Sequence, residues 1–339
     1  MKATITDVAK KAGVSMKTVS RVLNNEPNVA ETTRARVKAI AAELRYSPNI
    51  AARGLATSKS YLIALIYDNA SPNYLSHLQL GAIDACRDAG YHLVVQPLSL
   101  KSEWSREEKI RNTRAVLDHL PVDGVILTPP LGDSEAVLET LSELNIKAIR
   151  IAPKVQGQGP FIGMDDETAA YQMTQHLLEK GHRKIAFIRG HIDHSATSLR
   201  HKGFQRAMDE AGITVSENQI TQGDFTFASG AVAAKALLGL PKSERPTAVF
   251  ASNDDMAAAV ISVAGQFAIT VPNDLSVCGF DDTPLAKVVW PALTTIRQPI
   301  YKMGYQAAKQ LVKRSGEEVE VGQILDFEIM IRDSVVQIK

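Results

Sequence analysis

Residues 14–27 read VSMKTVSRVLNNEP, a stretch that crowds hydrogen-bonding side chains onto about two helical turns. Its apolar residues, Val19, Val22 and Leu23, form one narrow stripe at helical spacing. Lys17 and Arg21 are left for the opposite, polar face. Base edges in the major groove of duplex DNA present donors and acceptors that such side chains match. We therefore interpret this stretch as a DNA-recognition helix. The alternative is a solvated helix in a small bundle.

The residues around this helix predict a helix-turn-helix followed by a bracing helix. A first helix is expected to begin at Thr6-Asp7 and to stop at Gly13, and Ser15 is expected to cap the second helix. A third helix is expected over 31–44, with one apolar face formed by Val37, Ile40, Ala41 and Leu44. Together they make a small all-α domain at the N-terminus.

Charge is distributed unevenly along the chain. The first 60 residues hold eleven Lys and Arg against four acidic residues, a balance of +7. The whole chain of 339 residues carries only +1, so the remainder carries −6. This asymmetry indicates a basic module that meets a polyanion, attached to a mildly acidic body that does not.

Length and a hydrophobic content of 45% favour a globular protein of more than one domain. No run approaches the roughly 18 apolar residues of a membrane span, and the first residues lack a signal peptide's apolar stretch, so we expect a cytoplasmic location. Cys86 and Cys278 are expected to be buried thiols rather than a disulfide. His191 and His194 have no cysteine or carboxylate at ligand spacing, so we expect a solvated loop there, no metal and no cofactor.

From Tyr61 onward, short apolar runs alternate with amphipathic helical stretches. The runs are YLIALIY, HLVVQPL, DGVILTPP and KAIRIAP, then KIAFIRG, PTAVFAS and DLSVCGFDD, and the helices begin near Asn73, Trp104, Asp133, Glu167, Ala196, Ala228 and Asp254. Such alternation predicts parallel sheets. The two series break near Phe161-Ile162, which predicts an α/β core of two doubly wound subdomains. A ligand cleft is expected at the carboxyl ends of their strands.

The body lacks the short motifs of common enzyme classes. It has no G-x-G-x-x-G after the first strand, no Walker phosphate loop and no G-x-S-x-G elbow. The pairs Asp165-Asp166, Asp254-Asp255 and Asp281-Asp282 would suit glycoside chemistry only if both members of a pair faced one substrate. We expect instead that one member binds ligand hydroxyls and the other caps the following helix. The chain is therefore predicted not to be an enzyme. A glycoside-processing enzyme and a sugar-binding protein without DNA are the alternatives.

The N-terminal sequence TITDVAKKAGVSMKTVSRVLNNEPNVAETTRARVKAIAAELRYSPNIAARGLAT resembles the DNA-binding headpiece and hinge of LacI-family transcription regulators. The resemblance implies a homodimer with recognition helices in successive major grooves and paired hinge helices in the central minor groove, where Leu55 matches a leucine that opens a base step. Met16, Lys17 and Arg21 are expected to read bases. The expected DNA-binding residues are Thr4, Ile5, Ser15, Met16, Lys17, Ser20, Arg21, Asn24, Thr33, Tyr46, Asn49, Ala52 and Leu55.

The segments MDDETAA, GHRKIAFIRG, QGDFTFASG, ASNDDMAAA, CGFDDTPLA and PALTTIRQP resemble the LacI-family core, which is periplasmic-binding-protein-like. That architecture implies three crossings between subdomains, with returns near Trp290-Leu293 and Gly322-Leu325. The implied parts are a headpiece at 1–46, a hinge at 47–60 and a core at 61–339. The core would divide into an N-subdomain at 61–161 plus 292–323 and a C-subdomain at 162–291 plus 324–339.

The resemblance also assigns an effector site. Asp166 stands where family members hold sugar hydroxyls, Arg200 matches an arginine that clamps effector oxygens, and Phe225 matches a stacking aromatic. An apolar plate ringed by planar donors and acceptors suits a polyol ring. Asn253 and Asp281 are alternatively helix caps. The stretch DNASPNYLSHL departs from the family pattern, which leaves the roles of its residues open. The expected site residues are Asn69, Tyr74, Asp166, Arg200, Phe225, Asn253, Asp281 and Gln298.

The sequence therefore predicts a repressor that binds a palindromic operator as a homodimer and is controlled by a small-molecule effector, a sugar. The few residues after DFEIMIRDS are too short for the heptad tail of tetrameric relatives, so assembly is expected to stop at the dimer. A corepressor-type regulator with a non-sugar effector is the alternative.

Overall fold

The structure, a computed structural model, describes residues 3–23, 27–46, 59–68, 71–154, 157, 159–313 and 320–338. The chain divides into two compact units, Met1–Tyr61 and Leu62–Lys339. Most of the expected hinge, with Asn49, Ala52 and Leu55, lies outside the described residues, as do Asn24 and Asn69. Within the described residues, no helix is long and apolar enough to cross a membrane.

The first unit contains the three predicted helices, α1 (Ile5–Ala12), α2 (Met16–Leu23) and α3 (Glu31–Glu43). The cap of α1 is Thr4 rather than Thr6-Asp7, because Thr4 and Asp7 bond each other reciprocally in a capping box. Ser15 caps α2 as expected, since its Oγ accepts from the Thr18 amide at 3.1 Å. The apolar faces of the three helices meet in one core around Val8, Val19, Val22, Val37 and Ala41.

The second unit contains two six-stranded sheets. The first has the order β11-β5-β4-β3-β1-β2 and is parallel throughout. Its strands are β1 (Leu62–Tyr67), β2 (His92–Pro97), β3 (Gly124–Leu127), β4 (Ala148–Ile151), β5 (Phe161–Gly163) and β11 (Gly322–Ile324). The central strands are buried apolar runs, as sheets covered on both faces require.

The second sheet has the order β12-β10-β9-β8-β6-β7. Its strands are β6 (Ile185–Arg189), β7 (Ile220–Gln222), β8 (Ala248–Ala251), β9 (Ser276–Asp281), β10 (Thr294–Arg297) and β12 (Glu328–Met330). The predicted parallel arrangement is confirmed except at one edge, where β12 pairs antiparallel to β10. The chain re-enters this sheet from the neighbouring subdomain and therefore runs in the opposite direction.

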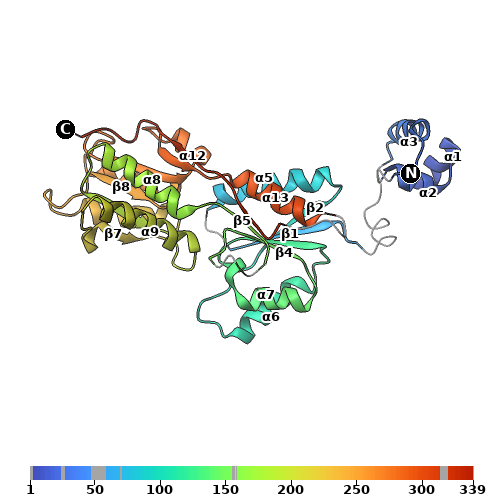
Figure 1. The fold of residues 1–339 in the computed structure, drawn as a ribbon, viewed down its shortest axis with the longest axis horizontal. Coiled ribbons are helices and arrows are strands. Elements are labelled where there is room, and N and C mark those ends of the chain that lie inside the picture. Colours follow the sequence, from blue (N-terminus) through green and yellow to red (C-terminus); the bar gives the residue numbers. More distant parts are fainter. Residues whose placement is uncertain are drawn as a thin grey trace. The chain divides into compact units, whose positions relative to one another are not determined.

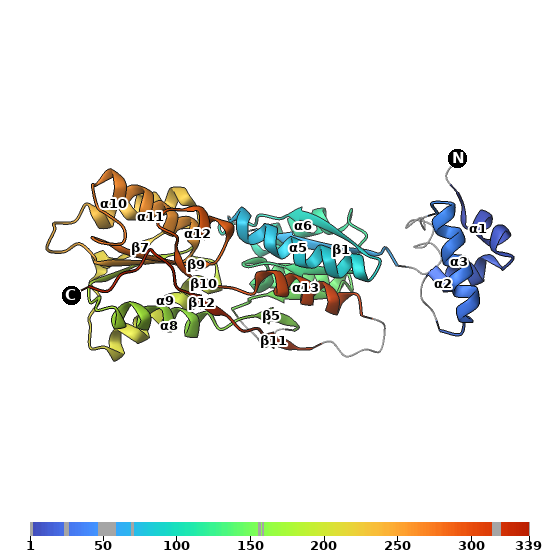
Figure 2. The ribbon, with the colours of Figure 1, turned by 90° about the horizontal axis from the view of Figure 1, so that it is seen from above.

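Helices cover both faces of each sheet. On the first sheet, α5 (Pro72–Asp88) and α13 (Ile300–Leu311) share one face, with α6 (Arg106–Leu117) and α7 (Glu135–Glu143) on the other (Figure 1). On the second sheet, α8 (Asp166–Glu179) and α9 (Ser195–Glu210) lie opposite α10 (Phe227–Leu238) and α11 (Asp254–Gln266) (Figure 2). The remaining described helices are η1 (Leu131–Asp133), η2 (Glu217–Gln219) and α12 (Pro284–Val288).

The chain passes between the two sheets three times, but two crossings differ from the expected boundaries. β5 pairs with β4, so the first crossing follows Gly163 and not Phe161. The second was expected near Trp290-Leu293, yet β10 pairs in parallel with β9 and crosses only after Arg297. Thr295 and Ile296 are fully buried in the second subdomain, and this burial holds the strand there. The third crossing, between β11 and β12, lies where it was expected.

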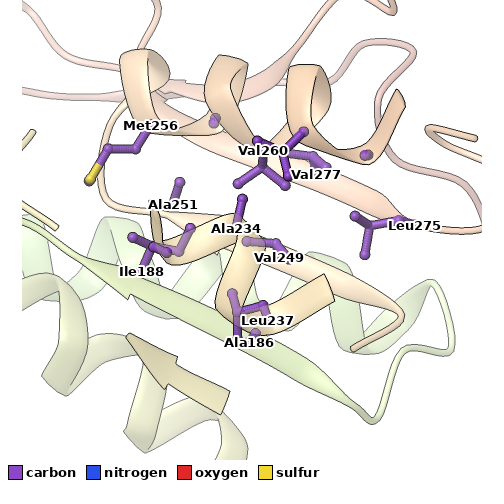
Figure 3. Close-up of a cluster of buried hydrophobic side chains, with 14 of the residues drawn as sticks. Ala186, Ile188, Ala234, Leu237, Val249, Ala251, Met256, Val260, Leu275 and Val277 are labelled. Carbon is purple, nitrogen blue, oxygen red and sulfur yellow. The ribbon is translucent and has the colours of Figure 1, made fainter. Parts of the chain in front are cut away.

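Each subdomain has its own apolar core. In the second subdomain, Val249, Leu237, Val260 and Val277 interdigitate between the sheet and helices α10 and α11 (Figure 3). The core of the first subdomain gathers around Ala64, Ile66, Val125, Leu127 and Val137. Cys86 and Cys278 are buried free thiols, which confirms the expectation from their spacing.

Helices α5 and α13 approach each other so closely that two positions admit only glycine. A Cβ at Gly81 would lie 2.0 Å from the backbone oxygen of Tyr301, and a Cβ at Gly304 would lie 2.1 Å from that of Leu78. Backbone atoms cannot yield as a flexible side chain can. This pair of helices therefore joins residues more than 200 positions apart through backbone contact.

We expect Gly81→Ala and Gly304→Ala each to lower the free energy of unfolding by roughly 1–3 kcal/mol, because the added methyl forces the two helices apart. Gly265→Ala in α11 is the matched control, since a Cβ there meets no atom within 4 Å. Alanine is favoured over glycine in a helix by roughly 0.5–1 kcal/mol, so the control should be neutral or stabilising. Urea unfolding followed by circular dichroism measures the difference. Equal losses in all three variants would contradict the close-contact explanation.

Candidate functional sites

The polar face of α2 is exposed, as its sequence predicts. Val19 and Val22 are buried in the core of the first unit, whereas Lys17 and Arg21 lie on the surface. Met16 is 53% exposed, which is unusual for a large apolar side chain that could pack against its own domain. The face thus presents cations, a thioether and, at its start, the Ser15 hydroxyl. These groups lie on the side of α2 that faces away from the core of the first unit.

The other expected DNA-binding residues are more varied in their surroundings. Thr4 is exposed at the start of α1, and Ser20 and Thr33 are half-buried. Ile5 and Tyr46 pack against the core of the first unit, and burial raises the pKa of Tyr46. Ile5 and Tyr46 therefore contribute to the packing of the first unit, whatever they contact on DNA.

The structure brings seven of the eight expected effector residues together in one cleft between the two subdomains of the second unit. Each lies beyond the carboxyl end of a strand or in the helix that follows it, the place where open α/β sheets bind ligands. All seven are less than 9% exposed. They are Tyr74, Asp166, Arg200, Phe225, Asn253, Asp281 and Gln298, and Ser71, Pro129, Ala152, His194 and Ala196 complete the lining.

Arg200 is the centre of the cleft. Its Nε donates to Asp166 Oδ1 at 2.7 Å, and its Nη1 donates to the Ser252 carbonyl oxygen. The guanidinium carbon lies 3.6 Å from the centroid of the Phe280 ring, within the range of a cation–π contact. These contacts fix the plane of the guanidinium. Its Nη2 makes no hydrogen bond to the described residues, so it can donate to a ligand oxygen.

Two carboxyl groups of this region are buried, Asp281 in the cleft lining and Asp254 outside it. Asp281 accepts from Gln298 Nε2 and lies 4.0 Å from Arg200 Nη1; burial raises the pKa of Asp281 well above its ordinary value, although Arg200 opposes the rise. Burial also raises the pKa of Asp254 from 3.8 to about 7, opposed by hydrogen bonds from Thr295 and Thr283. Burial therefore favours the protonated form of both carboxyl groups.

The carboxylate pairs follow the expected division of roles only in part. Asp165 caps α8 by accepting from the Thr168 amide, and its neighbour Asp166 faces the cleft, as predicted. Asp282 caps no helix; it bonds Arg297 and Arg332 because β10 and the chain after β12 bring these arginines alongside it. No pair turns both carboxylates toward one point in the cleft, the arrangement that paired-carboxylate hydrolysis needs.

The alternative role of Asn253 as a helix cap is correct. Its Oδ1 accepts from the Met256 amide at 3.0 Å, and its Nδ2 donates to the Phe225 carbonyl oxygen at 2.9 Å. Asn253 thereby positions Phe225, which has a φ of +71°. Asp281 is no helix cap, and it too has a positive φ, of 123°. Such backbone strain concentrates at ligand sites, where surrounding contacts hold it in place.

His194 was expected in a solvated loop and lies instead in the cleft wall. It is only 8% exposed, because its ring packs against Phe225 with centroids 5.3 Å apart. Burial lowers the pKa of His194 to about 4, and the nearby His191 and Arg200 add to the shift. The sequence contained one signal for this position, the helix expected to begin near Ala196. His194 comes directly before that helix, α9, and the N-terminus of α9 lies at the carboxyl edge of the sheet.

A hydrogen-bonded latch across the cleft was also missed by sequence reasoning. Asp255 on α11 accepts from Ser71 Oγ at 2.9 Å and from Asn73 Nδ2 at 3.4 Å. Asp255 belongs to the second subdomain, and its two donors belong to the first. Burial raises the pKa of Asp255, although these two hydrogen bonds oppose the rise. The latch links the subdomains directly beside the expected effector residues.

The cleft is equipped for binding. It offers a fixed guanidinium, carboxyl and amide groups and one aromatic plate, the inventory that orients a small polar ligand. The free space among these side chains is only about 40 Å³, far below the roughly 300–1,000 Å³ of ordinary small-molecule sites. A ligand therefore enters only if the two subdomains change their relative angle.

Two family models match this chain. The family model described as "Bacterial regulatory proteins, lacI family" matches residues 4–49, and the model "Periplasmic binding protein-like domain" matches residues 174–335. Catabolite control protein A of Priestia megaterium is 35% identical over 329 residues, which cover 96% of this chain and 97% of that protein.

Solved structures are similar over the full length. The transcriptional regulator CelR in complex with cellobiose gives a TM-score of 0.73 at 30% identity, covering 98% of this chain and 99% of that one. The lac repressor dimer bound to operator and the anti-inducer ONPF gives a TM-score of 0.78 at 27% identity, covering 99% and 100%. Both units of this chain thus have counterparts in one protein.

The raised pKa of Asp254 predicts a pH dependence of stability. Between about pH 4 and pH 7 the folded protein binds more protons at this group than the unfolded chain does, so its contribution to the free energy of unfolding falls as the pH rises and is flat above about 7. We expect Asp254→Asn, which has no titrating group, to show a shallower decline across this window. Urea unfolding at several pH values measures both proteins. The same slope in both would contradict burial of a titrating Asp254.

Proposed function

Because this chain belongs to the lacI family of bacterial regulatory proteins, we propose that it is a repressor that binds a palindromic operator as a homodimer and releases it when a sugar binds in the cleft. It is a DNA-binding transcription regulator, and we propose that it acts in the cytoplasm, where bacterial operators are. The observation that carries the proposal is the pairing of an exposed polar helix face with a closed polar cleft in one chain.

The first unit supplies the DNA-binding half of the proposal. Lys17 and Arg21 project from α2, and Met16 beside them offers an apolar contact of the kind that thymine methyl groups accept. Thr33 and Tyr46, with Asn24, are proposed to hold the phosphate backbone. Leu55 is proposed to enter the minor groove as an apolar wedge. The free-energy cost of unstacking the base step is recovered because the bent DNA contacts more protein.

Exposed apolar side chains of the second unit support a homodimer. Trp290 is 83% and Val288 76% exposed at the end of α12, and Leu80 and Ile83 are exposed on α5. In Figures 1 and 2, α12 and α5 lie on the same side of the second unit. A twofold interface there would cover these side chains, and a palindromic operator requires the same symmetry. The lac repressor in the operator complex is described as a dimer.

The lining of the cleft favours a sugar as the effector. The Phe225 ring supplies an apolar plate, and Arg200, Asp166 and Asp281 surround it with groups that bind hydroxyls. The CelR structure contains cellobiose, which is a sugar. A non-sugar corepressor remains the second candidate, because planar donors and acceptors also match a heterocycle.

The latch between Asp255 and Ser71 supports allosteric control. A ligand can shift an equilibrium only through a difference in affinity between two states, and the cleft as it stands has no room for a ring. Effector binding is therefore proposed to break or rearrange the latch and to rotate one subdomain against the other. The hinge leads directly into β1 of the first subdomain, so rotation changes the spacing of the two hinges in a dimer.

We expect Arg21→Ala to reduce affinity for operator more than affinity for unrelated DNA, because a lost base contact costs roughly 1–3 kcal/mol of discrimination. An operator selected from random duplexes and a scrambled duplex, each titrated by fluorescence anisotropy, provide the measurement. Lys309→Ala, a loss of one exposed cation on α13, is the control and should bind both duplexes as the wild type does. If Arg21→Ala weakens both duplexes equally, Arg21 does not read bases.

Arg200→Ala and Asp281→Ala are expected to bind operator normally and to ignore the effector, which gives permanent repression. The effector is first identified as the sugar that raises the melting temperature in a screen, since a ligand at 100 times its Kd adds roughly 2.7 kcal/mol of stability. It is then titrated into the protein–operator complexes. Arg206→Ala, an arginine on the same helix bonded to Glu167, is the matched control. Release at the wild-type concentration in both cleft variants would remove these residues from the site.

A further inference from the structure

A second cavity, of about 380 Å³, opens at the mouth of the cleft. We call it the outer cavity. The first subdomain lines it with Asp68, Leu100, Lys101, Ser102, Glu103 and Pro130, and the second with His191, Asp193 and His194. None of these nine residues belongs to the effector set that sequence reasoning assigned. The volume falls within the range of small-molecule sites, and the lining comes from both subdomains, as in the cleft itself.

The outer cavity is joined to the cleft through one side chain. His194 lines both spaces, and its ring packs between the rings of Phe225 and His191, with centroids 5.3 and 5.4 Å away. A neutral imidazole has one donor nitrogen and one acceptor nitrogen. His194 can therefore bond a hydroxyl of a molecule that extends from the Phe225 plate into the outer cavity. Pro129 in the cleft and Pro130 in the outer cavity continue the same wall on the other side.

The charges of the outer cavity indicate what kind of group fits there. Asp68, Glu103 and Asp193 contribute three carboxylates against the single ammonium of Lys101. Lys101 and Glu103 are exposed, so their side chains can turn toward a ligand. An excess of carboxylates repels phosphate and other anions. Hydroxyl groups, in contrast, bond carboxylates, imidazoles and ammonium groups alike, while Leu100 and Pro130 offer an apolar surface to a ring.

We propose that the effector is a neutral sugar of two rings, a disaccharide or a related glycoside, with one ring against Phe225 in the cleft and the second in the outer cavity. The proposal rests on the sugar-binding function proposed above and adds the size and the charge of the ligand. A two-ring ligand touches both subdomains at two places. Its affinity therefore depends more strongly on the relative angle of the subdomains than the affinity of a single ring does. Allosteric control requires such a difference in affinity between two arrangements.

Isothermal titration calorimetry on the full chain tests this proposal. The probes are glucose, galactose, glucose 6-phosphate and a panel of neutral disaccharides that includes cellobiose, lactose and maltose. We expect at least one disaccharide to bind at least tenfold more tightly than either monosaccharide or the phosphate. Ser102→Trp, which fills the outer cavity from an exposed position, should remove that preference and leave monosaccharide affinity unchanged. Lys101→Ala should also weaken the preference for the disaccharide over the monosaccharides.

Lys147→Ala is the matched control, because Lys147 is exposed just before β4, at the edge of the first sheet opposite the cleft. It should keep the wild-type preference. A monosaccharide or glucose 6-phosphate that binds as tightly as every disaccharide overturns the two-ring proposal and leaves the sugar function standing. An unchanged preference in Ser102→Trp also overturns it. If no probe binds the wild-type protein, the sugar class and the two-ring proposal fail together.

Discussion

The buried ion pair between Arg200 and Asp166 is the interaction on which the arrangement of the second unit's cleft depends. Removing two charges from water costs several kcal/mol per ion, and the cost is met only if partners surround both. Arg200, which lies in α9, finds those partners on three other elements, since Asp166 begins α8, Ser252 follows β8 and Phe280 lies in β9. The pair therefore constrains where these strands end, and those strand ends carry residues of the cleft lining.

Hydrogen bonds between elements also hold the cleft closed and keep the backbone of two of its residues in a strained conformation. Asp281 and Phe225 adopt positive φ angles, and each is held by a hydrogen bond from another element, Gln298 to Asp281 and Asn253 to the Phe225 carbonyl. The latch from Asp255 to Ser71 then draws the first subdomain against this edge. A ligand that enters must replace these contacts with its own. The cleft is thus closed by hydrogen bonds of a kind that a polar ligand is suited to exchange.

Sequence reasoning succeeded where a pattern is local. The strand in YLIALIY and the helix beginning near Asp254 follow from apolar periodicity alone, and both form where expected. It failed where a short segment had a choice of partners. β5, β7 and β11 have three residues each, too few to show alternation. β10 has four residues of which only Ile296 is apolar, and it was assigned to the wrong subdomain because only its pairing with β9 decides which sheet it joins. His194 looked like loop because its burial depends on Phe225, 31 positions later.

The sequence by itself determined the helix-turn-helix, the two series of strands and helices and, through resemblance, most of the cleft residues, because spacing along a helix or strand decides which side chains share a face. Tertiary structure decided which sheet holds β10, that Asp166 and Asp281 rather than Asp165 and Asp282 line the cleft, and that Asp255 meets Ser71 across 184 positions. It also formed the outer cavity from two subdomains. These features depend on which distant segments meet and on how deeply each charge is buried, and neither is a property of neighbouring residues.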